Sequence, residues 1–403
     1  FAIALAKISI GGAKSSEFAH EEPSGWRMIA ILVAAPLVAI VADRIVALAI
    51  PWRFVRLGAE LLSIGAATVV STQLVSTAPL RDPLPASPAP TGSPDVILVV
   101  LDTTRADHLS TYGYARETTP NLTKLAQDGL NFTSARSNAQ WTLPGHASLF
   151  TGLFPSQHGA HYVGTWKSNK PADRQHRAYP LSDAHTTLAE VLRDHGWATG
   201  AFVANFGNLH RGLGVAQGFS YFGDAPGPVI WPVPHGLRFA RQIAPYLLRV
   251  PFRAAPEITA EALGWFDQNA ANRPAFLFLN LLEPHYWIAS PPFDHWAREV
   301  PGWRRLAQRS LFSHVIPTHL SKHEADFAQA GYDGQVAAMD AALGQFFDAL
   351  KQRGRYDNAL IVVTADHGEL LGEHDIVGHG GRMMYEGLLH IPMVVKLPGQ
   401  AGA

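Results

Sequence analysis

The spacing of apolar residues divides the chain into two regions. Two long apolar runs, 28–50 and 57–80, contain very few charges, and each is close to the roughly 20 residues that cross a bilayer. Residues 1–10 are also apolar and resemble the end of a third membrane helix. After residue 94 the apolar runs are short and alternate with helical patterns, which is typical of a folded α/β domain.

Basic residues predict how the two long runs are oriented. Arg44, Arg53 and Arg56 lie at or near the loop between them, and the positive-inside rule places such a loop in the cytoplasm. We therefore expect a protein of the inner (plasma) membrane whose main domain, after residue 80, lies outside, in the periplasm or extracellular space. A pair of buried helices in a soluble domain is the alternative.

The segment between the two regions differs from both in composition. Residues 81–94 are rich in Pro, Ala and Ser, which predicts a semi-rigid linker. The chain begins without Met and stops directly after a strand-like run. We therefore expect a fragment in which the domain 95–403 is truncated at its C-terminus.

Short, largely apolar runs in the second region predict buried strands. They lie at 95–101, 198–203, 275–281, 359–364 and 391–396. Helices are predicted from Pro120 with Thr119 as cap, from a capping box at 187–190, at 258–269 and at 336–350. The apolar positions of the last helix are assigned to the core: Val336, Met339, Leu343, Phe346, Phe347 and Leu350. This alternation predicts an α/β fold with a largely parallel central sheet and helices on both faces.

Composition limits the chemistry available to this domain. The 32 basic and 33 acidic residues nearly cancel, so we expect no nucleic-acid partner. The absence of cysteine excludes disulfides, thiolate metal sites and cysteine nucleophiles. The 19 histidines favour a search for a metal or phosphate site.

Polar residues at the ends of the predicted strands indicate such a site. Asp102 follows the first strand, Asp366 and His367 follow strand 359–364, and His285 follows strand 275–281. The carboxyl ends of parallel strands meet at one edge, where ligands bind. Carboxylates and imidazole bind divalent ions such as zinc or manganese. A cap, a turn residue or a surface histidine would explain each residue taken alone.

Thr142 adds a candidate nucleophile. Pro144 suits the first position of a helix, which would place Thr142 just before the helix. The helix dipole at this end favours an anionic group and a hydroxyl converted partly into an alkoxide. An ordinary N-cap role for the threonine is the alternative.

Beyond these single residues, the chain strongly resembles the sulfatase branch of the alkaline phosphatase superfamily over about residues 94–399. The matching motifs run in the family's order: 102–109, 112–114, 119–122, 129–132, 141–152, 187–190, 217–219, 283–285, 366–369, 372–374 and 385–392. The resemblance implies an alkaline-phosphatase-like fold. It also implies that the family's smaller C-terminal subdomain is missing from this chain.

The resemblance assigns roles to individual residues. The metal ligands it implies are Asp102, Thr142, Asp366 and His367, and the catalytic residues are Thr142, His285, His379 and His146. Among the histidines, His285 is the first choice for protonating the leaving alcohol. Substrate binding is predicted for Gly145, Arg105 and Arg382.

The chain departs from the usual sulfatase motif at the nucleophile. Sulfatases typically have a cysteine, converted to formylglycine, where Thr142 stands, and Gly145 and His146 replace the family's Ser and Arg. In this respect the chain is similar to phosphoethanolamine and phosphoglycerol transferases and to nucleotide pyrophosphatases. Thr103 replaces a second metal carboxylate of many sulfatases, which favours one zinc or manganese ion, with calcium as a further option.

We therefore expect a metal-dependent hydrolase of sulfate or phosphate esters that forms a covalent ester with Thr142. The alternatives are a head-group transferase acting on lipid or glycan, and a non-catalytic membrane-anchored relative. The expected partners are the membrane and an anionic ester substrate, with a lipid- or glycan-linked ester as one option. The segments 161–185 and 286–330 are aromatic and partly basic, and we expect them to cover the substrate unless they are simple surface excursions.

Overall fold

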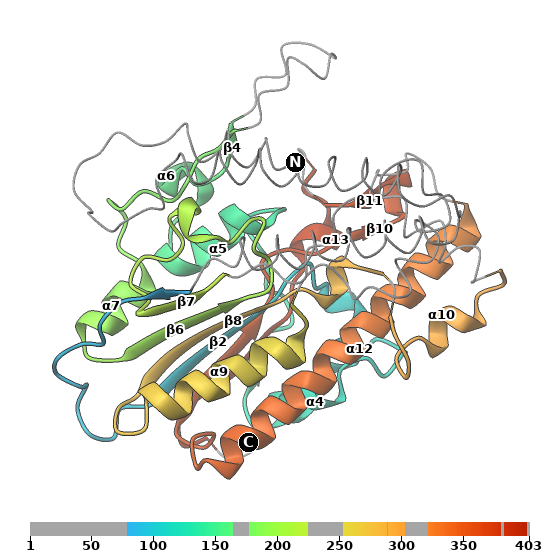
Figure 1. Cartoon of the computed structure of the whole chain (residues 1–403). Helices are drawn as coiled ribbons and strands as arrows, with labels where there is room; N and C mark the ends of the chain where they lie inside the picture. The colour runs from blue at the N-terminus through green and yellow to red at the C-terminus, as the bar shows by residue number, and fades with distance from the viewer. Residues whose placement is uncertain are drawn as a thin grey trace, which may run out of the picture. The chain divides into compact units, whose positions relative to one another are not determined.

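The computed structural model describes residues 79–163, 177–224, 253–287, 289–302, 321–379 and 383–400 (Figure 1). The predicted membrane helix 28–50, the predicted helix end at 1–10 and all but the last two residues of the run 57–80 lie outside these ranges. Within the described ranges, no helix combines the length and hydropathy needed to cross a bilayer.

An eight-stranded sheet forms the centre of the described domain (Figure 1). Its order is β1 (Leu80–Arg81), β7 (Tyr221–Gly223), β6 (Ala198–Val203), β8 (Ala275–Leu281), β2 (Asp95–Leu101), β9 (Ala359–Thr364), β12 (Met393–Lys396) and β3 (Leu130–Asn131). The five strands from β7 to β9 are parallel, and the three outer strands are antiparallel to their neighbours. The predicted largely parallel sheet is confirmed.

Four of the five predicted strands have the bounds read from the sequence. The fifth begins at Met393 instead of residue 391. Pro392 has no N–H to give to a neighbouring strand, and the Ile391 N–H donates to the Ala135 carbonyl outside the sheet. The regular ladder therefore starts only after the proline.

Helices cover both faces of the sheet, as predicted. On one face lie α4 (Pro120–Gln127), α9 (Ala255–Asn269) and α12 (Lys322–Gln352); on the other lie α5 (Thr142–Thr151) and α7 (Leu188–Asp194) (Figure 1). Strand β2 separates the two cores, because successive side chains point to opposite faces. Val99 joins the cluster under α9 and α12, whereas Val100 joins the cluster under α5.

Smaller elements complete the described chain. They are the helices α6 (Pro155–His158), α10 (His295–Glu299) and α13 (Glu386–Leu389), and the hairpins β4 (Tyr162–Val163) with β5 (Arg177–Ala178) and β10 (Leu370–Leu371) with β11 (Val377–Gly378). The β10–β11 hairpin follows closely after the carboxyl end of β9 in the sequence.

Helix α12 is longer than predicted. It has 31 residues instead of the 15 expected at 336–350. Gly331 and Gly334 interrupt the apolar pattern, but close packing explains them: a Cβ on Gly331 would lie 1.9 Å from the Trp287 carbonyl oxygen, and one on Gly334 would lie 2.3 Å from the Phe293 oxygen. The glycines let the chain after β8 pass against the helix. The predicted core positions are buried.

One predicted helix cap is correct and one is wrong. Thr187 caps α7 together with Glu190, whose N–H lies 3.2 Å from the Thr187 hydroxyl. Thr119 precedes α4 but makes no cap bond. Asp340 of α12 instead accepts the N–H groups of Asn121 and Leu122 at 2.9 and 2.8 Å, so a carboxylate from a distant part of the chain replaces the local cap.

The segment 81–94, predicted to be a linker, lies against the domain. The Trp197 indole donates to the Pro94 carbonyl at 3.0 Å. Ala89 is buried, and its N–H donates to the Gly196 carbonyl at 3.2 Å. Ala89 and Pro94 are thus held against the domain, and the linker role of the segment stays a prediction.

Candidate metal and active site

Three ligand-type side chains meet at the carboxyl ends of β2 and β9. The two strands are adjacent and parallel, with Val100 paired to Thr364, so both end at the same edge. Asp102 follows β2, and Asp366 and His367 follow β9. All three side chains are almost completely buried, and their ligand atoms lie within 4.8 Å of one another. The strand-end pattern therefore located a real cluster.

The atoms that face one another in this cluster lack protein partners. Asp102 Oδ1, Asp366 Oδ2 and His367 Nε2 are buried and have no hydrogen-bond partner among the described residues, a costly arrangement for polar atoms. His367 Nδ1 lies 2.8 Å from the Gly368 carbonyl, so this nitrogen carries the proton and Nε2 presents its lone pair. Two carboxylates and a neutral imidazole fit a divalent cation.

The electrostatics of the cluster agree with this fit. Burial and the nearby Asp102 charge raise the pKa of Asp366 well above its ordinary value. Burial, followed by the neighbouring His379, lowers the pKa of His367 well below its ordinary value. A divalent cation would favour the ionised carboxylates and keep the imidazole neutral.

Thr142 lies at the first position of α5, next to this cluster. The helix begins at Thr142 with Trp141 before it, so the start predicted at Pro144 is wrong by two residues. Proline is tolerated here because the first N–H groups of a helix have no intrahelical acceptor. The Thr142 hydroxyl accepts a hydrogen bond from Asn205 Nδ2 at 3.2 Å and does not cap the helix, so the N-cap alternative is also wrong.

Two asparagines complete the surroundings of Asp102, and sequence reasoning missed both. Asn205 Nδ2 donates to Asp102 Oδ2 at 2.9 Å as well as to Thr142. Asn280 Nδ2 donates to the same oxygen at 3.2 Å, and its own oxygen accepts the Asn205 N–H at 2.9 Å. These bonds orient the Asp102 carboxylate and leave its Oδ1 available as a ligand for a cation. The available signal was their position: Asn205 lies just after β6 and Asn280 interrupts the apolar run of β8.

His146 and Gly145 support the packing of α5 against Asp366. His146 is fully buried; its Nδ1 lies 2.9 Å from the Thr142 carbonyl and 3.4 Å from Asp366 Oδ2, and burial lowers its pKa. A Cβ on Gly145 would lie 2.9 Å from the Asp366 carbonyl oxygen, and the Gly145 N–H donates to Trp141 at 3.4 Å. The catalytic role of His146 and the substrate contact of Gly145 stay predictions.

Two further histidines lie beside the ligand cluster. The ring centroid of His379 is 4.4 Å from that of His367 and 4.9 Å from that of His285. Burial disfavours a charge on His379, but Glu369, whose Oε2 lies 3.1 Å from His379 Nδ1, outweighs this and raises the pKa. Burial and the neighbouring His379 lower the pKa of His285. The two rings therefore prefer different protonation states.

Arg105 connects the elements that carry the site. Its buried guanidinium donates to Glu373 at 2.6 Å, to Asp107 at 2.8 Å and to the Glu369 carbonyl at 3.0 Å. These bonds link the turn after β2 to the β10–β11 hairpin, which His379 follows. The guanidinium is thus engaged within the protein, and its substrate contact stays a prediction, while Arg382 lies outside the described residues.

The predicted substrate-covering segments are described only in part. Residues 164–176 and 303–320 lie outside the described ranges, as does residue 288. The described residues of the second segment include α10, which packs against α12, and the first turns of α12 itself. The covering role of this segment stays a prediction.

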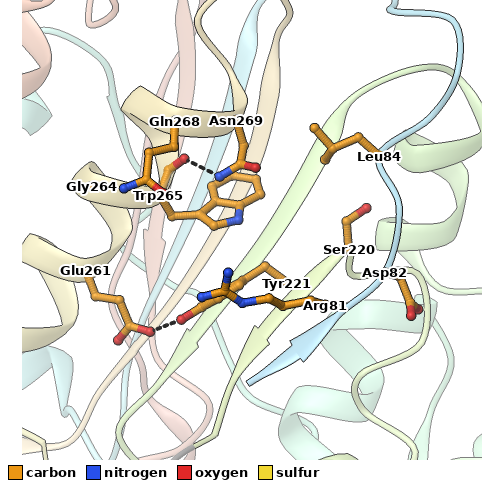
Figure 2. A pocket seen from close by; sticks show the side chains of 10 residues that line it. All are labelled: Arg81, Asp82, Leu84, Ser220, Tyr221, Glu261, Gly264, Trp265, Gln268 and Asn269. Carbon is orange, nitrogen blue, oxygen red and sulfur yellow. Dashed lines mark hydrogen bonds between the residues drawn. The ribbon is translucent and has the colours of Figure 1, made fainter. Parts of the chain in front are cut away.

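A cavity of about 360 Å³ lies between edge strand β1 and helix α9 (Figure 2). Its walls include Arg81, Tyr221, Glu261 and Trp265, and none of the predicted site residues lines it. The Arg81 guanidinium lies 5.9 Å from the centre of the Tyr221 ring, and the Tyr221 hydroxyl donates to the Glu261 carboxylate. The polar groups of the wall thus contact one another, and the cavity is separate from the strand-end cluster.

Comparison with known proteins places this site in a family. The family model described as "Sulfatase" matches residues 94–403. Arylsulfatase K of Canis lupus familiaris is 24% identical over 343 residues, covering 76% of this chain and 59% of that protein. The multifunctional alkaline phosphatase superfamily protein PehA of Trinickia caryophylli is 27% identical over 364 residues, covering 76% and 68%.

A solved structure shows the same fold. The phosphonate monoester hydrolase of Agrobacterium radiobacter superposes with a TM-score of 0.53 at 23% identity, covering 76% of this chain and 68% of that one. The chain spans only about 59% of the length of arylsulfatase K. The family model nevertheless covers well over half of this chain and all of the strand-end cluster. The chain belongs to the sulfatase family.

Proposed function

We propose that this chain is a metal-dependent ester hydrolase of the sulfatase family in which the unmodified hydroxyl of Thr142 is the nucleophile. One observation carries the proposal: a single side-chain amide, that of Asn205, contacts both the Thr142 hydroxyl and the ligand carboxylate of Asp102. The hydroxyl therefore lies beside the unpartnered ligand atoms. The names of the relatives, an arylsulfatase and a phosphonate monoester hydrolase, support sulfate and phosphonate esters as substrates.

Asp102, Asp366, His367 and Thr142 would hold the ion. When bound, it supplies Lewis acidity that lowers the pKa of the threonine hydroxyl and withdraws charge from the ester. The imidazole ligand favours zinc or manganese, because calcium prefers a shell of oxygen ligands.

In the first half of the reaction, the Thr142 oxygen attacks sulfur or phosphorus and the bond to the alcohol breaks. Asn205 holds the attacking oxygen in place, and the N-terminus of α5 favours the negative charge. His379, on which the neighbouring Glu369 favours a proton, donates that proton to the departing alcohol. The Glu369 carboxylate, 3.1 Å from His379 Nδ1, favours His379 as the donor, and His285 is the alternative donor.

In the second half, water attacks the covalent Thr142 ester. The neutral His285 accepts the proton of that water, Thr142 leaves as the alkoxide, and the inorganic or organic acid is released. The proton then passes to the neighbouring His379, whose ring centroid is 4.9 Å away. Two groups with pKa values displaced in opposite directions are suited to such a division of acid and base roles.

The test is an ester panel combined with a nucleophile variant. Aryl sulfate, phosphonate monoester, phosphodiester and phosphate monoester are offered with zinc, manganese or calcium. T142A should abolish turnover while circular dichroism and metal content stay as in the wild type, and T142S should retain part of the activity. Full activity in T142A would contradict the proposal.

Product analysis separates hydrolysis from the transferase alternative. A hydrolase releases the free acid whether or not an acceptor alcohol is present, whereas a transferase modifies the acceptor. The absence of bound ion after purification in metal-rich buffer would favour the non-catalytic alternative.

Membrane anchoring is a separate proposal. It rests on the apolar runs 28–50 and 57–80 and on the arginines between them. The full chain should stay in the membrane fraction after a carbonate wash and enter solution in detergent. Protease added to intact cells with a permeable outer layer should cleave the domain after residue 80 if it lies outside.

A further inference from the structure

Glu283 is a buried acidic residue that the reaction above does not use. It begins the short 3-10 turn η5 (Glu283–His285) at the end of β8, and its side chain is 5% exposed. One carboxylate oxygen accepts a hydrogen bond from the Ala255 N–H. The other oxygen has no hydrogen-bond partner among the described residues.

The bond to Ala255 supplies a cap that α9 lacks. Ala255 is the first residue of this 15-residue helix, and the preceding Ala254 has no side chain that could cap it. The Glu283 carboxylate takes this place from another element, at the positive end of the helix dipole. The same carboxylate is two residues before His285, so it ties the turn that carries His285 to α9.

The other side of the turn is fixed by α12. Within η5, the His285 N–H donates to the Leu282 carbonyl at 3.2 Å. Directly after it, the Trp287 carbonyl packs so closely on α12 that a Cβ on Gly331 would lie 1.9 Å from its oxygen. The backbone around His285 is therefore held between two helices, with the Glu283 carboxylate as its link to α9.

This link is costly for the fold. Burial raises the pKa of Glu283 to about 7, and the bond to Ala255 offsets this only in part. A buried acid with one oxygen unpaired is a poor choice for a helix cap alone, since a serine or asparagine at position 254 would cap α9 locally. The feature that a local cap would not provide is the connection to His285.

We propose that Glu283 is a positioning residue for His285: its carboxylate binds the first N–H of α9 and thereby holds η5 so that the imidazole of His285 faces His379. The inference rests on the proposed role of His285 in turnover. It adds a residue that acts only through another side chain.

The first test compares E283A with E283Q. E283A loses the acceptor for the Ala255 N–H, and a small displacement of His285 should lower kcat by about 10- to 100-fold with little change in KM. E283Q keeps an oxygen in the same place and should retain most of the wild-type kcat. An E283A variant with wild-type kcat, or an E283Q variant as impaired as E283A, would overturn the proposal.

Two controls separate positioning from loss of stability. T187A removes the cap of α7 on the opposite face of the sheet; it should lower the melting temperature but leave kcat within about twofold. In an H285A background, E283A should cause no further fall in kcat, because a positioning residue acts through His285 alone. An equal additional fall in that background would contradict the proposal.

A readout without turnover distinguishes failure of this inference from failure of the proposed function. The imidazole signal of His285, assigned by its loss in H285A, is followed by NMR in the metal-loaded protein. It should move in E283A and return in E283Q even if no ester in the panel is cleaved. An unchanged His285 signal in E283A would refute the positioning role, whereas lack of turnover in the wild type would refute only the proposed hydrolase.

Discussion

Two buried aspartates flank the same central strand and show how differently one side chain can be used. Asp95 begins β2, and its two oxygens accept bonds from Arg355 at 2.7 Å each and from the Ala275 N–H at 2.8 Å. Asp102 follows the other end of β2. The side-chain amides of Asn205 and Asn280 donate to its Oδ2, whereas its Oδ1 has no hydrogen-bond partner among the described residues. All the hydrogen-bonding needs of the Asp95 oxygens are met within the protein, whereas Asp102 keeps one buried oxygen that could bind a cation.

Burial alone does not identify a functional carboxylate. Both side chains are at most 5% exposed. The difference lies in the partners: a guanidinium cancels the charge of Asp95, while two amides orient Asp102 and leave its charge uncompensated. Substitutions at the two ends of β2 should therefore affect different properties of the protein.

The largest effect should come from D102N. Loss of this ligand should remove the bound ion and lower kcat/KM by at least about 1000-fold, because the ion supplies several kcal/mol of transition-state stabilisation. Metal-free D102N should melt at the same temperature as the metal-free wild type or higher, since one of two close carboxylates is gone. Metal analysis and calorimetry check both points; a D102N variant that still binds the ion tightly would remove Asp102 from the ligand set.

D95A should have the opposite profile. It leaves Arg355 without its carboxylate partner and should lower the free energy of unfolding by about 2–4 kcal/mol. Metal content and kcat per folded molecule should stay within about twofold of the wild type. Urea unfolding measures the free energy of unfolding. A large loss of kcat in fully folded D95A would show that Asp95, like Asp102, is needed for turnover and would contradict the prediction.

Glu283 adds a third buried carboxylate, and its stability effect depends on pH. Its pKa in the folded protein, about 7, is above its ordinary value of 4.5. Between these values the folded state holds more protons than the unfolded state, so the free energy of unfolding falls as pH rises, by on the order of 3 kcal/mol in total. In E283Q, which has no titratable group at this position, the free energy of unfolding should not show this fall with pH. Urea unfolding from pH 4 to 8 tests it, and parallel curves for wild type and E283Q would contradict it.

A smaller effect is expected at Asn205. N205A removes the amide shared by Asp102 and Thr142 and should lower kcat/KM by about 10- to 100-fold, in line with other residues that orient metal ligands. N280A removes a bond to Asp102 and the acceptor of the Asn205 N–H, but it keeps the Asn205 side chain that contacts Thr142, so it should lower kcat/KM less. Equal losses in the two variants would show that the bond to Thr142 contributes nothing of its own.

The sequence predicted the sheet and the ligand cluster because both depend on local pattern. The runs that form β2, β6, β8 and β9 are short and largely apolar, so their bounds could be read directly. A general rule about parallel sheets then selected Asp102, Asp366 and His367.

The parts that could not be predicted depend on long-range side-chain bonds. Asp340 caps α4 from 219 residues away, and Asn205 reaches Asp102 across 103 residues. A single asparagine or aspartate carries no periodicity that marks its distant partner. The same holds for Arg105, whose contact with Glu373 lies 268 residues away along the chain and could not be read from the sequence.

The close packing of Gly145 on Asp366 determines whether the formylglycine motif of typical sulfatases would fit at the start of α5. The formylglycine motif of typical sulfatases has a serine at the position of Gly145, but a Cβ there would lie 2.9 Å from the Asp366 carbonyl oxygen. A backbone oxygen cannot swing aside as a flexible side chain would. Exchanging Gly145 for serine would therefore require α5 to move slightly away from Asp366. A cysteine at position 142 would not by itself install the formylglycine motif, because the helix would have to shift as well.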